Sequence, residues 1–195
     1  GATKEVLKNI IIDGNVANNG TANRWEYCSE IKFRTKSGVL ENTEINNSCG
    51  EGVVVWGDNP QINNFRGTNL NGNGIHFNAG CNDCVVNNVY IDGCCIDMNI
   101  GHSNGGIIAS NSTYRTVVTN WTVKNSRRCS IGSFDQSDNA FSKMINGYAE
   151  GCFDGLGLIG TSNGDNMEVS NVTIKQCGPS VIGVDRSSNA LIWKA

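Results

Sequence analysis

Two polar residues, His76 and Asp97, are the leading candidates for chemistry in this 195-residue chain. Successive side chains of a strand point to opposite faces, so the strand-like segments 74–78 and 95–99 would direct these two residues outward. If the segments stack on adjacent coils, a carboxylate lies beside an imidazole. That arrangement orients the ring and favours its charged form, which suits proton transfer in a hydrolase or lyase. The alternative is a solvated pair without a catalytic role.

The same outward columns collect groups that suit sugar binding. An aromatic ring stacks on the apolar face of a sugar, while guanidinium, ammonium and amide groups bond its hydroxyls. We therefore predict a polysaccharide-binding ridge beside the proposed catalytic pair. Its expected contact residues are Lys32, Arg34, Trp56, Asn78 and Asn99.

The composition indicates which elements position these residues. Asn occurs 29 times and Gly 24 times, and both are poor helix formers but good turn formers. Pro occurs only twice, and much of the remainder is Val, Ile, Thr and aromatic residues. This composition predicts many short strands joined by tight turns.

A repeated tetrad, in which Asn is followed by two variable residues and an apolar residue, runs along the chain. Consecutive copies are 22 to 33 residues apart, which fits a unit near 24 residues with two insertions. Each unit divides into three strand-like pieces. An Asn at the same corner of every coil tolerates a left-handed bend, and its amide can bond to the Asn above and below. The tetrads begin at Asn9, Asn42, Asn64, Asn88, Asn120, Asn146 and Asn171.

This Asn-apolar-x-Ile-x-x-Cys repeat resembles that of the right-handed parallel β-helix (pectate-lyase-like) superfamily. Pectate lyases, polygalacturonases and phage tailspike or appendage proteins have this fold. The resemblance implies an all-β, single-stranded right-handed parallel β-helix of about seven coils, each of three short strands, with Asn and Cys ladders. The polygalacturonase motifs Asn-Thr-Asp, Asp-Asp, Gly-His-Gly and Arg-Ile-Lys are not intact here. We expect one domain over residues 1–195, cut from a longer protein because neither end carries a cap.

The chain has nine cysteines, an odd number. Cys94, Cys152 and Cys177 lie in a column of small residues six positions after the tetrad Asn, and Cys49 is displaced from it by one. Buried thiols stack well as small hydrophobes, which favours reduced, structural cysteines. The Cys81–Cys84 pair has metal-site spacing but lacks a second pair, whereas zinc needs about four ligands. We therefore expect neither a metal nor another cofactor.

Charge and hydropathy exclude two classes of partner. The net charge of −3 disfavours nucleic acid, and no apolar run approaches the roughly 20 residues that would cross a membrane. We expect a tailspike-like protein of the virion or the extracellular space that binds a cell-surface polysaccharide and, if it is an enzyme, depolymerises it as a hydrolase or lyase. The alternative is a non-catalytic structural or adhesin segment of a fibre, for which a homotrimer is one arrangement.

Overall fold

The computed structural model describes nine segments of the chain, which form fifteen strands and no helix. No helix long and apolar enough to span a membrane occurs among these segments. They are residues 4–18, 28–78, 80–97, 104–110, 113–134, 141–159, 168–178, 180–183 and 191–193. The strands are β1 (Val6–Asp13), β2 (Ser29–Arg34), β3 (Val39–Asn46), β4 (Glu51–Trp56), β5 (Gln61–Thr68), β6 (Ile75–Phe77), β7 (Val85–Cys94), β8 (Gly105–Ser110), β9 (Thr116–Ser126), β10 (Cys129–Phe134), β11 (Phe141–Glu150), β12 (Asp154–Ile159), β13 (Glu168–Lys175), β14 (Ser180–Gly183) and β15 (Leu191–Trp193).

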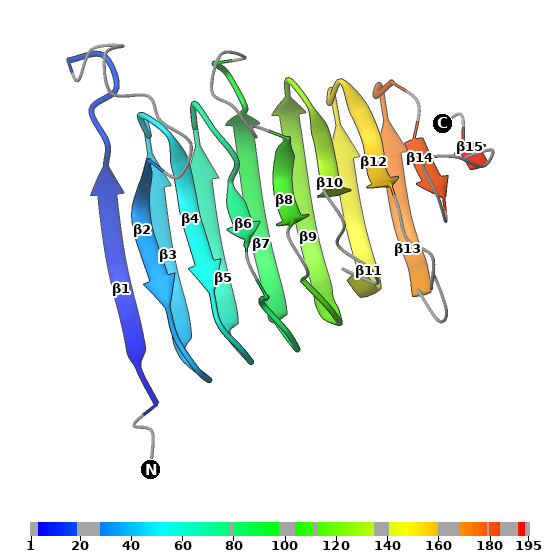
Figure 1. Ribbon diagram of the computed structural model, residues 1–195. Coiled ribbons are helices and arrows are strands. Elements are labelled where there is room, and N and C mark those ends of the chain that lie inside the picture. Colours follow the sequence, from blue (N-terminus) through cyan, green and yellow to red (C-terminus); the bar gives the residue numbers. More distant parts are fainter. Residues whose placement is uncertain are drawn as a thin grey trace.

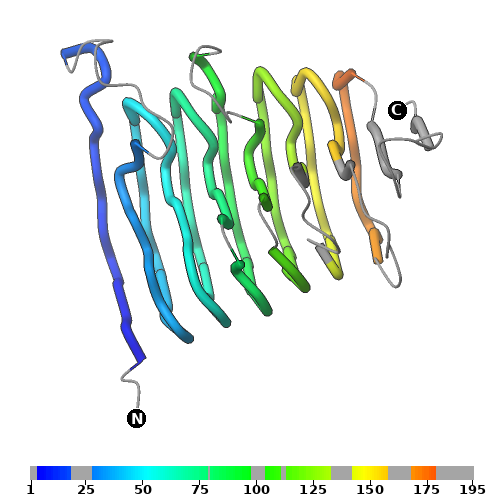
Figure 2. Tube along the Cα trace, in the orientation of Figure 1, coloured from blue at the N-terminus to red at the C-terminus, as the bar shows by residue number. Residues whose placement is uncertain are grey.

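The strands stack into a parallel β-solenoid with two sheets (Figure 1). The odd-numbered strands from β1 to β13 form sheet A, and the even-numbered strands with β15 form sheet B. Every neighbouring pair is parallel except β14 and β15, which are antiparallel. The trace in Figure 2 shows each coil lying on the one before it. The predicted β-helix class is therefore confirmed.

The coils differ in detail from the prediction. The solenoid makes about five turns, against the seven expected. Each coil contributes two strands rather than three, because the short piece before a ladder Asn and the tetrad after it form one long strand. In β7, for example, residues Val85–Asn87 and Val89–Asp92 both pair with β9, and Asn88 between them is bent out of register.

The predicted Asn ladder is present at that bend. All seven tetrad Asn residues adopt left-handed backbone angles, with φ between 52° and 56°. The amide of Asn64 donates to Asn42 at 2.8 Å, and Asn88 donates to Asn64 at 2.8 Å. One step differs, because Asn120 donates to Asn87 rather than to Asn88. The ladder therefore holds successive coils in register by repeated side-chain hydrogen bonds.

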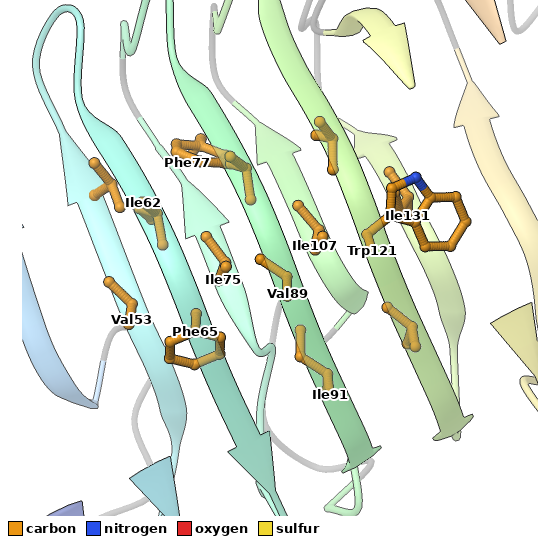
Figure 3. Close-up of a cluster of buried hydrophobic side chains, with 14 of the residues drawn as sticks. Val53, Ile62, Phe65, Ile75, Phe77, Val89, Ile91, Ile107, Trp121 and Ile131 are labelled. Atoms are coloured by element: carbon orange, nitrogen blue, oxygen red, sulfur yellow. The ribbon is translucent and has the colours of Figure 1, made fainter. Parts of the chain in front are cut away.

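Apolar side chains from both sheets fill the space between them (Figure 3). Sheet B contributes the inward column Ile31, Val53, Ile75, Ile107, Ile131 and Leu156, each paired with the next. The expected stacking of segment 95–99 on segment 74–78 is wrong, because Ile107 follows Ile75 in register.

Trp121 shows how closely this core is packed. Its side chain is buried, as expected, at the position of sheet A that pairs with Gly147. A Cβ atom built at Gly147 would lie 2.1 Å from the Trp121 ring, so only glycine leaves room for the indole.

Candidate functional site

A hydrogen-bonded chain of three polar side chains links three consecutive strands of sheet B. The Nδ1 atom of His76 on β6 lies 2.9 Å from Oε1 of Glu51 on β4. The Nε2 atom of His76 lies 2.7 Å from the Ser110 hydroxyl oxygen on β8. The side chains are 0 % exposed for Glu51, 2 % for His76 and 3 % for Ser110. We call these three residues the Glu–His–Ser network.

The network lies on the outer side of sheet B, away from the core between the sheets. His76 alternates with Ile75 and Phe77, which belong to the core cluster. In register, His76 pairs with Val54 and Ile108, and neither of these belongs to that cluster. Strand alternation therefore directs His76 outward.

Glu51 reaches the same outer side through an irregularity in β4. A Cβ atom built at Gly52 would point toward the core side chains of Phe65 and Leu70. The next residue, Val53, also belongs to the core cluster. Two successive inward positions break the alternation, which returns Glu51 to the side that carries His76.

Asn73 anchors the carboxylate to the neighbouring coil. Its amide nitrogen donates to Glu51 Oε1 at 2.6 Å. Its carbonyl oxygen accepts from the backbone nitrogens of Asn104 at 2.6 Å and Gly105 at 2.9 Å. Asn73 thus connects the carboxylate with the start of β8, which carries Ser110 at its other end.

These contacts define the donors and acceptors along the network. Glu51 Oε1 receives the Asn73 amide proton, so it acts as an acceptor, and a carboxylate accepts from the Nδ1–H group of His76 in the same way. In the tautomer that carries its proton on Nδ1, Nε2 accepts from the Ser110 hydroxyl. A general base in contact with a hydroxyl is the arrangement that activates a serine nucleophile.

The predicted register, which places Asp97 directly after His76 on the next coil, is wrong. The residue that follows His76 in register is Ile108, because the next strand of sheet B is β8. The segment that contains Asp97 stacks on the preceding turn instead. Its Asp97 backbone nitrogen donates to the Asn71 backbone carbonyl at 3.2 Å. The carboxylate that contacts His76 belongs to Glu51, from the coil before. Asn99 lies outside the described residues.

The structure describes four of the five predicted sugar contacts. Lys32 pairs with Val54, and Arg34 pairs with Trp56. The Arg34 guanidinium lies over the Trp56 ring, 4.9 Å from its centre. Lys32 and Arg34 are exposed and Trp56 is half-buried, whereas Asn78 is buried beside the network. Among the described members of the predicted ridge, the accessible ones therefore lie on β2 and β4.

All nine cysteines are free thiols in the structure. Cys81 and Cys84 are buried and hydrogen-bonded to each other, which lowers the pKa of Cys81 and raises that of Cys84. Burial raises the pKa of Cys152 to about 12. No cluster of three or more potential metal-binding side chains occurs in the described segments.

A second surface, on the outer face of sheet A, is absent from the sequence prediction. An open hollow lies over β1, β3 and β5, lined by ladder residues together with Ile11, Glu44 and Arg66. The sequence feature that could have revealed this surface is the third position of each tetrad, where variable side chains form an outward column. That column is Ile11, Glu44, Arg66, Tyr90, Thr122, Tyr148 and Thr173.

Cations order this column of sheet A. The Arg66 guanidinium lies over the Tyr90 ring at 4.7 Å, and the Lys124 ammonium lies 5.5 Å from the centre of the Tyr148 ring. Tyr90 also donates its hydroxyl proton to Asp92 at 3.1 Å. These contacts fix long side chains that would otherwise be mobile at the surface.

Comparison with known proteins finds no matching family model, no similar curated protein and no similar solved structure.

Proposed function

We propose that this β-solenoid binds an extended polysaccharide along the outer face of sheet A. The observation that carries the proposal is the column Glu44, Arg66, Tyr90, Thr122 and Tyr148, whose members are all exposed or half-buried. It runs across five consecutive strands beside the Asn ladder. A linear ligand lying along the solenoid axis would meet one of these side chains at every coil.

The chemistry of this face suits a ligand rich in hydroxyl groups. Asn amides and the Thr122 hydroxyl can donate and accept, while Arg66 donates and Glu44 accepts. The face mixes both signs of charge, with ion pairs such as Lys8–Glu41 and Lys124–Glu150. Such a surface favours a neutral or weakly charged glycan over a polyanion. Pre-ordering by the cation–ring contacts reduces the entropy lost on binding.

The ridge on sheet B supports this function less well. Of the predicted sugar contacts that the structure describes, Lys32, Arg34 and Trp56 are accessible there, and they lie on two strands. A ligand would therefore span two strands rather than five. We further propose that the protein belongs to a phage tailspike or another extracellular fibre and assembles as a trimer. Depolymerisation of the bound glycan is part of the same proposal.

The test is binding to a panel of neutral and acidic bacterial surface polysaccharides, measured by glycan array and affinity electrophoresis. We expect Arg66→Ala and Tyr148→Ala each to weaken binding about tenfold, the effect of losing one good hydrogen-bonding or stacking contact. Arg34→Ala on sheet B is the matched control and should leave the affinity unchanged.

Two results would overturn the proposal. A loss confined to Arg34→Ala would move binding to sheet B. An absence of binding across the panel would favour the structural fibre segment.

A further inference from the structure

We propose that the Glu–His–Ser network is the catalytic centre of a serine ester hydrolase, with Ser110 as nucleophile, His76 as general base and Glu51 as the residue that positions the imidazole. The proposal does not depend on glycan binding, because the network lies on sheet B and the proposed glycan surface on sheet A. It rests on two hydrogen bonds, 2.9 Å and 2.7 Å long, that join the three side chains in the order nucleophile, base and orienting carboxylate.

The reaction follows from the donors and acceptors of the network. The Ser110 oxygen attacks the ester carbonyl carbon as its proton passes to His76 Nε2, and the negative charge develops on the carbonyl oxygen. Collapse of this intermediate breaks the bond to the alcohol oxygen, which leaves with the proton from Nε2. Water then attacks the acyl-serine and gives a proton to His76, which returns one to the Ser110 oxygen. The sum is ester and water converted to carboxylic acid and alcohol.

The neighbours of the network indicate the substrate class. Val54 and Ile108 precede and follow His76 in its outward column, and both are fully buried. Asn78, two residues after His76, is also buried. The apolar neighbours favour an uncharged, apolar acyl group over a charged one. We infer a short-chain acyl ester.

Two features distinguish this network from a structural hydrogen-bond cluster. The outward column elsewhere places apolar residues in these buried positions, as Val54 and Ile108 show, so burial alone does not require polar groups there. The second carboxylate oxygen of Glu51 is also buried and has no hydrogen-bonding partner among the described residues. An incompletely satisfied carboxylate is unfavourable for stability, and such groups are concentrated at functional sites.

Burial also constrains how the site works. With Ser110 only 3 % exposed, bulk water is excluded from the network, which strengthens each electrostatic contact within it. Because the serine is nearly buried, a small, reactive probe is the appropriate reagent.

The test combines an alkyl fluorophosphonate probe with hydrolysis of p-nitrophenyl acetate. Attack by the Ser110 oxygen on phosphorus would displace fluoride and leave a stable phosphonyl-serine, which mass spectrometry locates by peptide. We expect one adduct, on Ser110, and a loss of about a hundredfold or more in kcat/KM in Ser110→Ala and His76→Gln.

Three further variants separate catalysis from folding. Ser130→Ala is the matched control, because Ser130 is a buried serine of β10 that bonds to the Gly155 carbonyl, away from His76; it should keep full labelling and activity. Ser110→Cys should fold as the parent does and react with iodoacetamide at that position. Glu51→Gln should shift the pH dependence of kcat/KM, which a merely structural role would not do.

The outcomes are decisive. A folded parent protein that neither takes the probe nor hydrolyses the ester, or one labelled at a serine other than Ser110, would overturn the proposal. Glycan binding should be unchanged in Ser110→Ala, so failure of either function is recognised independently.

Discussion

The Asn ladder of sheet A and the Glu–His–Ser network of sheet B both join consecutive coils by side-chain hydrogen bonds, yet they differ in composition and burial. The ladder repeats one residue type at an exposed corner, as in Asn42 and Asn64. The network uses three different side chains, once each, in a buried place. Repetition therefore accompanies the structural role, whereas the unrepeated buried groups are the ones that can perform chemistry.

The difference has an energetic side. A ladder hydrogen bond at an exposed corner competes with water, so each contributes modestly to stability. Members of the buried network have no water to replace a lost partner. Three predictions, in decreasing order of effect, test whether burial sets the contribution of each contact.

The largest effect is expected from Glu51→Ala. The change leaves the Nδ1–H group of His76 and the amide of Asn73 without their buried acceptor, which should lower the free energy of unfolding by about 3 kcal/mol. Urea denaturation followed by circular dichroism measures it. Glu44→Ala on the outer face of sheet A is the control, with an expected loss of about 0.5 kcal/mol. Equal effects at the two positions would contradict the comparison.

An intermediate effect is expected within the ladder. Asn64 donates to Asn42, accepts from Asn88 and adopts φ of 55°, so Asn64→Ala should cost about 2 kcal/mol in hydrogen bonds and left-handed strain. Asn64→Gly removes the same bonds but tolerates the conformation, and should recover up to about 1 kcal/mol. Asn9→Ala, at a position with one ladder bond, should cost less than Asn64→Ala. The same denaturation series measures all three, and a glycine variant no better than the alanine variant would show that backbone strain is unimportant.

The smallest effect is expected at another left-handed corner, where Asp83 and Arg115 form an exposed ion pair. Unlike the ladder Asn, these two residue types do not recur from coil to coil. The hydrogen bond from Arg115 lowers the pKa of Asp83. Because the pKa is lowered by folding, the pair stabilises the fold at pH values above the unfolded-state pKa, which is near 3.9. This stability is lost as the pH falls through the folded-state pKa. Because water screens the pair, it should contribute no more than about 0.5 kcal/mol.

A carboxyl NMR titration checks that last expectation. Arg115→Gln should move the Asp83 pKa up toward the unfolded value and should reduce stability only slightly at neutral pH. A loss of stability comparable with that of Glu51→Ala would show that burial does not set the contribution of each contact to the free energy of unfolding.

The sequence predicts part of the site from strand alternation. Strand alternation places His76, Lys32, Arg34 and Trp56 on the outer face, because a period of two persists wherever strands stay regular. It misses Glu51 because two successive inward residues, Gly52 and Val53, break that period.

Ser110 is missed for a different reason. The sequence places the segment 95–99 next to His76, whereas the insertion before β8 delays the true neighbour until Ile108. Nothing in the local sequence distinguishes a stacked strand from a segment that stacks on the preceding turn, as Asp97 does. An error of this kind misplaces every outward residue on the coil.

The repeat alone therefore determined the solenoid and its Asn corner, because one residue type recurring at a fixed spacing requires similar surroundings on every coil. Only the tertiary structure decided which side chains meet across coils of unequal length. Register depends on backbone pairing between strands that are 20 or more residues apart, and a single irregularity or insertion moves a carboxylate from one partner to another. The contacts of His76 with Glu51 and Ser110 are set at that level.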